Sequence, residues 1–309
     1  YADSTKGWIP TNDIANALES VLPPTQRAIF GFGTTNTPTR ITNLVNSSGV
    51  VASDTNAAGS VNNGPAAATY GLDKAIFAFG DGTNISALVN TSGAVSADVT
   101  GVGTARTNLA AASYGGDKAI FAFGGASGSR LSMSNLVSNS GVVASDTTGV
   151  GTARNILAAL GFGTSGQAIF GYGTTGSDTN LSNLVSNVGV VASDTTGVGT
   201  ARDGLGGASY GVDKGIFAYG KTGSFVSLKN LVSNTGIIAS DVSGVGTARS
   251  ALAAASYGGD KALFGYGENG SGNSSLKNLV SNTGVVAADV SGVGTARQYL
   301  AAAGFSTSA

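Results

Sequence analysis

The sequence predicts an all-β protein, a six-bladed β-propeller of four-stranded antiparallel blades, from three observations. Each repeat holds four strand-like runs separated by Gly-rich turns. The first repeat lacks its first run, and the C-terminus carries an extra one at residues 300–305. We therefore expect the last strand to complete the first blade, so that no sheet edge stays open. The repeat spacing is 44 to 49 residues, marked by Phe30, Phe77, Phe121, Phe170, Phe217 and Phe264.

The third complete repeat illustrates the four runs. Residues 109–113 read Leu-Ala-Ala-Ala-Ser, and residues 119–123 read Ala-Ile-Phe-Ala-Phe after a turn of Gly and Asp, which tolerate positive φ. The third and fourth runs, 134–138 and 142–144, flank a second tight turn. The second run is apolar on both faces, so we expect it to be covered on both faces. The small side chains of the first run suit strands crowded around a narrow axis.

One domain is expected, the propeller at 27–309, preceded by a short N-terminal tether at 1–26. Thr11 or Asn12 caps a predicted short helix, and Pro23 stops it because proline lacks an N–H group. Two roles remain open for this helix, which either covers one face of the main domain or tethers that domain to a partner. The candidate tether residues are the only Trp and three residues of one apolar helix face: Trp8, Ile14, Leu18 and Leu22.

Composition argues against several classes of function. The chain has no Cys and no His, which removes disulfides, thiolate metal sites and the commonest general base. The net charge of −1 gives no basis for steering toward nucleic acid. No apolar run reaches the roughly 18 residues of a membrane span. We therefore expect no enzyme, no cofactor, no metal site, no nucleic-acid partner and no membrane insertion.

Aspartate closes the fourth run of every repeat, and an arginine follows eight residues later in five of the six connectors. Asn62 replaces the arginine in the first connector. Partly buried charges of this kind hold register, and losing one partner costs more than the pair contributes. We interpret them as one structural contact per blade rather than as a ligand-binding ring. The residues assigned this role are Asp98, Arg106, Asp146, Arg154, Asp194, Arg202, Asp241, Arg249, Asp289 and Arg297.

The loop between the second and third runs differs in length and side chains from repeat to repeat. Alternating strand direction places these loops on the same face as the Gly-Val-Gly-Thr-Ala-Arg connectors. Variable loops on a rigid scaffold are where recognition usually lies, although neutral drift in exposed loops stays open as the alternative. The candidate binding residues are Arg40, Asp81, Arg130, Met133, Asp178, Lys221, Phe225, Lys229, Glu268 and Lys277.

The repeats resemble the kelch family of propellers over residues 27–305. The resemblance lies in the order Ala-Arg-x-x-Leu-Ala-Ala-Ala followed by Lys-Ala-Ile-Phe-x-Phe-Gly, as at residues 105–124. The self-similar composition rich in Gly, Ala, Ser, Thr and Asn is also similar to repeat arrays in virion proteins of tailed bacteriophages.

These resemblances imply a non-catalytic structural or adhesion module, such as a phage fibre or decoration protein. It would lie on the virion surface, bound through residues 1–26 to other virion or scaffold proteins. The loop face would then meet a host-surface protein or glycan, or neighbouring subunits in an oligomer. The alternative is a cellular, secreted or cell-surface kelch-like scaffold that binds protein or glycan.

Overall fold

The computed structural model describes residues 2–3, 7–8 and 26–307. Every regular element in these residues is a β-strand, and each pairing is antiparallel, so the predicted all-β class is confirmed. The helix predicted near residues 12–22, with Ile14, Leu18 and Leu22, lies outside the described residues. Trp8 ends β2 (Gly7–Trp8), whose backbone pairs with β1 (Ala2–Asp3).

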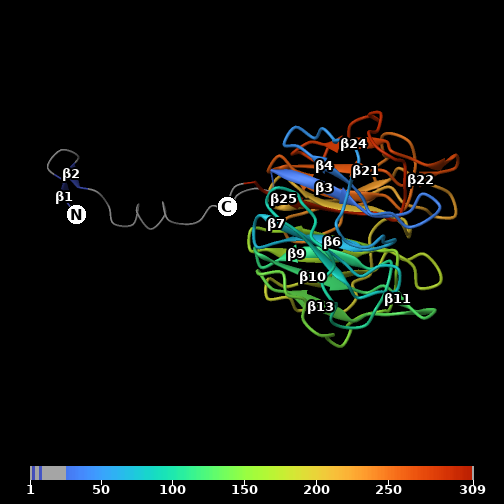
Figure 1. Cartoon of the computed structure of the whole chain (residues 1–309), viewed down its shortest axis with the longest axis horizontal. Helices are drawn as coiled ribbons and strands as arrows, with labels where there is room; N and C mark the ends of the chain where they lie inside the picture. Colours follow the sequence, from blue (N-terminus) through green and yellow to red (C-terminus); the bar gives the residue numbers. More distant parts are fainter. Residues whose placement is uncertain (1, 4–6, 9–25, 308–309) are drawn as a thin grey trace.

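Six antiparallel sheets correspond to the six repeats (Figure 1). From first to sixth, their strand orders and bounds are β25-β3-β4-β5 (Ala301–Phe305, Arg27–Gly31, Ile41–Val45, Thr55–Asn56), β6-β7-β8 (Ala66–Tyr70, Lys74–Ala78, Ser86–Val89), β9-β10-β13 (Ala110–Tyr114, Lys118–Ala122, Ser134–Val137), β14-β15-β16 (Ala158–Phe162, Gln167–Gly171, Ser182–Val185), β17-β18-β19 (Gly206–Tyr210, Lys214–Ala218, Lys229–Val232) and β20-β21-β24 (Ala253–Tyr257, Lys261–Gly265, Lys277–Val280). Two small hairpins lie in the loops, β11-β12 (Gly125–Ala126, Ser129–Arg130) and β22-β23 (Glu268–Asn269, Gly272–Asn273).

The C-terminal strand pairs with the first strand of the repeat region, as the sequence predicts. β25 runs antiparallel to β3 in a register that places Ala301 opposite Gly31 and Phe305 opposite Arg27. Backbone segments about 270 residues apart in the chain therefore form one continuous ladder. This pairing gives the first sheet the inner strand that its own repeat lacks.

The fourth run of each repeat forms less regular structure than predicted. Only the first sheet has a fourth strand, β5, and elsewhere in the described residues the run makes isolated bridges. In the third repeat Val143 bridges Val137 and Thr147 bridges Ser134. The four-residue advance from Val143 to Thr147 therefore lies opposite a three-residue advance from Val137 to Ser134 in β13. The extra residue is a bulge, which interrupts the ladder and explains why no continuous strand forms.

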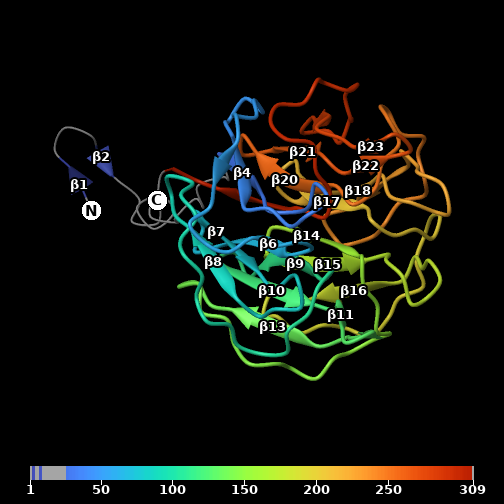
Figure 2. The same cartoon turned by 45° about the vertical axis from the view of Figure 1, so that its right-hand side comes forward.

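The first strands of the sheets lie side by side near the middle of the molecule (Figure 2). In sequence order β6, β9, β14, β17 and β20 each pack on the next, and β25 packs on both β20 and β6. Small residues allow this approach, and hydroxyls connect the strands. Ser113 Oγ, for example, donates to the Thr69 carbonyl oxygen at 2.9 Å.

Six residues that precede the first strands form a ring of backbone hydrogen bonds, here called the axial ring. Each N–H donates to the carbonyl of the preceding member, at 2.8 to 3.1 Å, and the sixth bond returns to the first residue. All six have positive φ, between 52° and 65°. The members are Gly64, Asn108, Ile156, Gly204, Ala251 and Tyr299.

The core lies between neighbouring sheets. The Phe of each second strand packs against an aromatic ring of the preceding sheet, as Phe170 does on Phe123, with centroids 5.5 Å apart. Six such pairs occur in the described residues, and the Phe30–Tyr266 pair connects the first sheet to the sixth. Tilted and edge-on ring pairs of this kind stabilise a core beyond their buried area.

The sheets have two ends with different connections. The turns between the first and second strands lie at one end, the turn face, and the loops with β11-β12 and β22-β23 lie at the other, the loop face (Figure 1). The repeat region begins and ends at the turn face. Gln26 accepts a hydrogen bond from Gly258 N, and Ser306 N donates to the carbonyl of Asp73, where Gly258 and Asp73 belong to first-to-second-strand turns.

Candidate functional site

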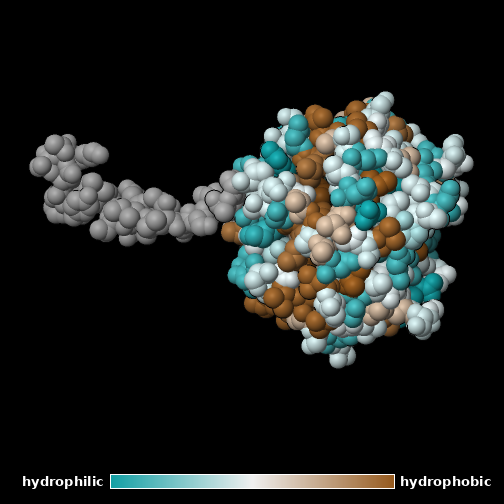
Figure 3. All heavy atoms as spheres, viewed as in Figure 1, coloured by the Kyte–Doolittle hydropathy of each residue, from teal (hydrophilic) through white to brown (hydrophobic). Residues whose placement is uncertain are grey.

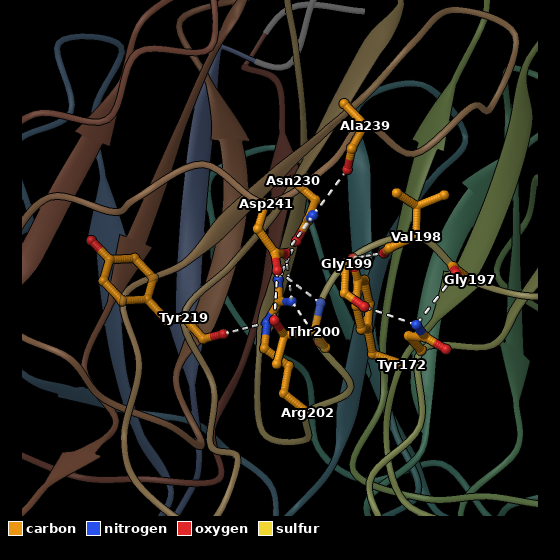
Figure 4. Close-up of polar contacts among 11 residues, drawn as sticks. Tyr172, Gly197, Val198, Gly199, Thr200, Arg202, Tyr219, Asn230, Ala239 and Asp241 are labelled. Atoms are coloured by element: carbon orange, nitrogen blue, oxygen red, sulfur yellow. Dashed lines mark hydrogen bonds and ion pairs between the residues drawn. The ribbon is translucent and has the colours of Figure 1, made fainter.

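The arginines that recur in the connectors are buried between adjacent sheets. Arg202 is fully buried, and its guanidinium carbon lies 4.3 Å from the centroid of the Tyr172 ring in the fourth sheet. Its Nε donates to the carbonyl of Tyr219 in the fifth sheet at 2.9 Å, and Nη2 donates to Asn230 Oδ1 at 2.6 Å (Figure 4). One side chain therefore connects two sheets by a cation–π contact on one side and hydrogen bonds on the other.

Asn230 and Asp241 complete this junction. The Asn230 amide donates to Asp241 Oδ1 at 2.9 Å, and Asp241 Oδ2 accepts from both the N–H and the hydroxyl of Thr200. Burial alone would raise the pKa of Asp241, but the bonds from Thr200 and Asn230 outweigh it and hold that pKa below its usual value. The carboxylate is thus charged at neutral pH and already occupied by groups of the chain.

Burial lowers the pKa of the connector arginines, yet they keep their charge. The pKa of Arg154 falls to about 10 because its guanidinium is desolvated, with Asp194 acting in the opposite direction. A group with this pKa is protonated throughout the physiological range. The Nε, Nη1 and Nη2 atoms of Arg154 all donate to groups of the chain, so the arginine holds the junction as a cation.

Each arginine pairs across the sheets rather than with the aspartate eight residues before it in the sequence. Arg106 Nη1 lies 3.8 Å from Asp146 Oδ1, and similar geometry relates Arg154 to Asp194, Arg202 to Asp241 and Arg249 to Asp289. Asp54 accepts the N–H and hydroxyl of Thr295, which extends the pattern to Arg297 between the sixth and first sheets. Sequence spacing alone did not identify these partners.

The connector before the second sheet is the exception. Asn62 takes the arginine's place, and its Nδ2 donates to the Phe79 carbonyl, the counterpart of the Tyr219 carbonyl. The acceptor is replaced as well, because Ala87 stands where Asn230 stands in the fifth sheet. Asp98 remains and accepts the Ser60 N–H at 2.9 Å. The guanidinium and its acceptor are thus lost together at this junction. Among Asn62, Ala87 and Asp98, the one buried side-chain atom without a partner in the described residues is Asn62 Oδ1.

Most of the predicted binding residues lie in loops at the loop face. Arg40, Asp81 and Asp178 are exposed, whereas six others are half-buried by their neighbours. Such loops pair with the connector that precedes their sheet, as the bridges Asp203–Lys221 and Ser250–Glu268 show. The half-buried residues are Arg130, Met133, Lys221, Phe225, Lys229 and Glu268.

Two predicted loop residues are placed elsewhere. Lys229 and Lys277 are the first residues of β19 and β24, and their side chains run between the sheets. Lys229 Nζ donates to the Gly284 carbonyl and Lys277 Nζ to the Gly49 carbonyl, at 3.1 and 3.0 Å. Both acceptors belong to the outer turn of the next sheet. These lysines therefore join neighbouring sheets and do not contribute to the loop face.

Sequence reasoning missed two groups of residues. The first is the buried Asn of the third strand, such as Asn230, which occurs in five of the six repeats and is absent where the arginine is absent. The second is the residue between each connector arginine and the axial ring, here called the rim position. The rim residues, all polar, are Asn63, Thr107, Asn155, Asp203, Ser250 and Gln298. The signal for both was variation between the repeats themselves.

Comparisons with known proteins gave no match: no model of a known family fits the chain, and no curated protein matches it. In the part of the chain that the structure describes, no helix is long and apolar enough to cross a membrane. Within the same residues, no three metal-ligating side chains lie close enough together to hold an ion.

Proposed function

We propose that the six sheets are the blades of one closed, kelch-like β-propeller, with the C-terminal strand completing the first blade. The β25–β3 ladder, the cycle of first-strand contacts and the axial ring support this architecture. A closed ring leaves no first or last sheet edge to pair with another chain.

The protein then serves as a non-catalytic structural or adhesion module of a virus particle, such as a phage fibre or decoration protein. Residues 1–26 tether it to other virion or scaffold proteins, and the loop face meets a host surface or neighbouring subunits. The observation that carries this proposal is the position of the two ends of the repeat region. Gln26 and Ser306 lie at the turn face, opposite the loops that differ between repeats.

The charged residues that recur along the chain also favour a structural scaffold. Most of their hydrogen-bonding groups are taken up inside the junctions, as for Arg202 and Asp241, whereas Arg106 Nε and Arg297 Nη2 are buried without a partner among the described residues. The repeated charges therefore hold the sheets together. The differing side chains gather at the loop face, where recognition does not disturb the scaffold.

The test is to measure the chain in purified virus particles by quantitative mass spectrometry. A fixed copy number per particle is expected. Leu18→Glu in the full chain should abolish attachment without changing the melting temperature, because it alters only the tether. Lys261→Ala, a turn-face substitution outside the tether, serves as the control and should leave attachment intact. A chain found only free in solution would contradict the virion role.

A further inference from the structure

Two neighbouring positions carry a different pair of residues in every repeat of a chain whose repeats are otherwise near copies. They are the rim position and the axial-ring position. The residue before this pair is Arg in five repeats, and the residue after it is Leu in five. The axial-ring position has positive φ, which suits Gly, yet Ile156 and Tyr299 occupy it with φ of 54° and 52°. A β-branched or bulky residue in this conformation is strained. The backbone alone does not explain these side chains, whereas a role in binding would.

The axial-ring positions surround a pit at the loop-face end of the axis, and the rim positions directly precede them in the chain. The pit has a volume of about 70 Å³, and its floor consists of Pro65 and the leucines that follow the axial ring, such as Leu157 and Leu300. Asn108, Ile156 and Tyr299 of the axial ring also line it. The pit is thus apolar at the bottom and bears polar and aromatic groups at its mouth.

A second recess lies beside the pit. It has a volume of about 220 Å³ and is enclosed by β11-β12, with Arg130, and by the rim residues Thr107 and Asn155. Arg130 Nε donates to Asn155 Oδ1 at 3.3 Å, which orients the guanidinium toward the rim. Thr107 and Asn155 directly precede Asn108 and Ile156, which line the pit, so residues adjacent in the chain line the two hollows. Small-molecule pockets are commonly on the order of 300–1,000 Å³, so this pair suits one ring rather than a long chain.

The rim residues carry groups suited to a polyhydroxylated ligand. Five of the six rim residues are uncharged amides or hydroxyls, which both donate and accept hydrogen bonds as sugar hydroxyls do. The carboxamide oxygens of Asn63 and Gln298 are buried at the rim without a partner among the described residues, so each keeps an unused acceptor. Tyr299 supplies an aromatic face and Arg130 a planar fork of donors.

We propose that the pit and the recess together form a carbohydrate site for one terminal sugar residue. The ring of the sugar lies in the recess against Arg130, Thr107 and Asn155, and a methyl substituent enters the leucine-floored pit. Sugars that carry an acetamido or 6-deoxy methyl group are therefore favoured, by roughly four-fold per buried methyl. This inference rests on the proposed function, because it names the ligand class of the loop face.

The first experiment applies the full chain to a printed array of bacterial and animal oligosaccharides. Binding to methyl-bearing terminal sugars is expected, with the free monosaccharide as competitor. Arg130→Ala and Asn155→Ala should each weaken binding about ten-fold, since each removes hydrogen bonds to the ligand. Lys118→Ala, on the turn face of the same repeat, should leave binding unchanged, and all variants should keep the parent melting temperature. Silence across the array, or binding that both loop-face variants leave intact, would overturn the carbohydrate site.

The second experiment separates this inference from the proposed function. The full chain is applied to envelopes of the bacteria on which the virus grows, before and after mild periodate oxidation of their sugars. Loss of binding after oxidation is the expected result. Binding that survives oxidation would leave adhesion standing and overturn the sugar ligand, whereas an absence of the chain from particles would count only against the virion role.

Discussion

The guanidinium carbon of Arg154 lies 4.1 Å from the centroid of the Phe123 ring. Phe123 follows the second strand of the third sheet, and the Nε of Arg154 donates to the carbonyl of Tyr172 in the fourth. The same contact recurs with Phe79, Tyr172, Tyr219 or Tyr266 as the ring. The interfaces between sheets are therefore held by one buried cation each, apart from the interface that contains Asn62.

Replacing a junction arginine should destabilise the fold without affecting a ligand. Arg202→Ala leaves Asn230 without its donor inside the interface, and breaking such a buried network costs about 3–5 kcal/mol. We expect the melting temperature to fall by roughly 5–10 °C. Lys214→Ala, an exposed substitution in the same sheet, is the control. A loss of binding at unchanged stability would contradict the structural role.

The tyrosines that replace phenylalanine at three of these ring positions add one hydrogen bond each. Tyr172 Oη donates to the Val198 carbonyl at 3.2 Å, and Tyr219 and Tyr266 make the equivalent bond. Tyr172→Phe should lower the free energy of unfolding by about 1 kcal/mol, measured by urea denaturation. The reciprocal Phe123→Tyr tests the geometry at a position that lacks the hydroxyl. An unchanged denaturation midpoint in Tyr172→Phe would show that the bond contributes nothing.

The interface before the second sheet offers a double-mutant test. Asn62→Arg alone places a buried cation where Ala87 provides no acceptor, so it should be destabilising. Adding Ala87→Asn should recover part of this loss, with a favourable coupling of roughly 0.5–3 kcal/mol between the two positions. Thermal unfolding of the four proteins measures the coupling. If the effects of the two substitutions on stability simply add, the Arg–Asn hydrogen bond does not explain why this interface lacks both residues.

The stability should depend on pH through Asp203. Burial and repulsion from Asp178 raise the pKa of Asp203 to about 6, although attraction to Lys221 acts in the opposite direction. The folded protein then binds this proton more tightly than the unfolded chain, in which an Asp titrates near about 3.9. Its contribution to stability is complete below about pH 4 and is lost as the pH rises through about 6. Junction carboxylates such as Asp241, whose pKa is lowered, act oppositely, and their contribution is lost as the pH falls below about 4.

Thermal unfolding between about pH 3 and pH 8 checks this reasoning. The melting temperature of the parent chain should fall between about pH 4.5 and pH 6.5, and Asp203→Asn should be more stable than the parent at the upper end and flatter over that range. Asp178→Asn should shift the parent transition to lower pH, because it removes the repulsion. A parent-like slope in Asp203→Asn would refute the assignment.

Local patterns predicted the strands well, and contacts between distant residues were missed. The Gly-Asp turns and alternating runs are local features, and the extra C-terminal run identified the partner of Arg27–Gly31 by counting alone. The charged partner of Arg202 is Asp241 rather than Asp194, the nearer aspartate in sequence, because the connector is held by the sheet that follows it. No spacing rule within one repeat contains that information.

The candidate loop face was predicted only in part, for a similar reason. Lys229 was predicted to lie in the loop between the second and third runs, but its long stem reaches the Gly284 carbonyl of the next sheet. The rim residues were missed because the Arg before them and the Leu after them recur from connector to connector. Apolar side chains, among them the exposed Val142 and Val190, lie among polar ones over the surface (Figure 3).

Amide hydrogen exchange of the C-terminal strand tests the central claim most directly, since closure of the ring depends on the β25–β3 ladder. The peptide covering residues 301–305 should exchange as slowly as that covering residues 253–257, the equivalent strand of the sixth sheet, because both lie between two neighbours. Exchange within seconds over residues 301–305, with residues 253–257 still protected, would mean that the chain end is frayed and the ring is open.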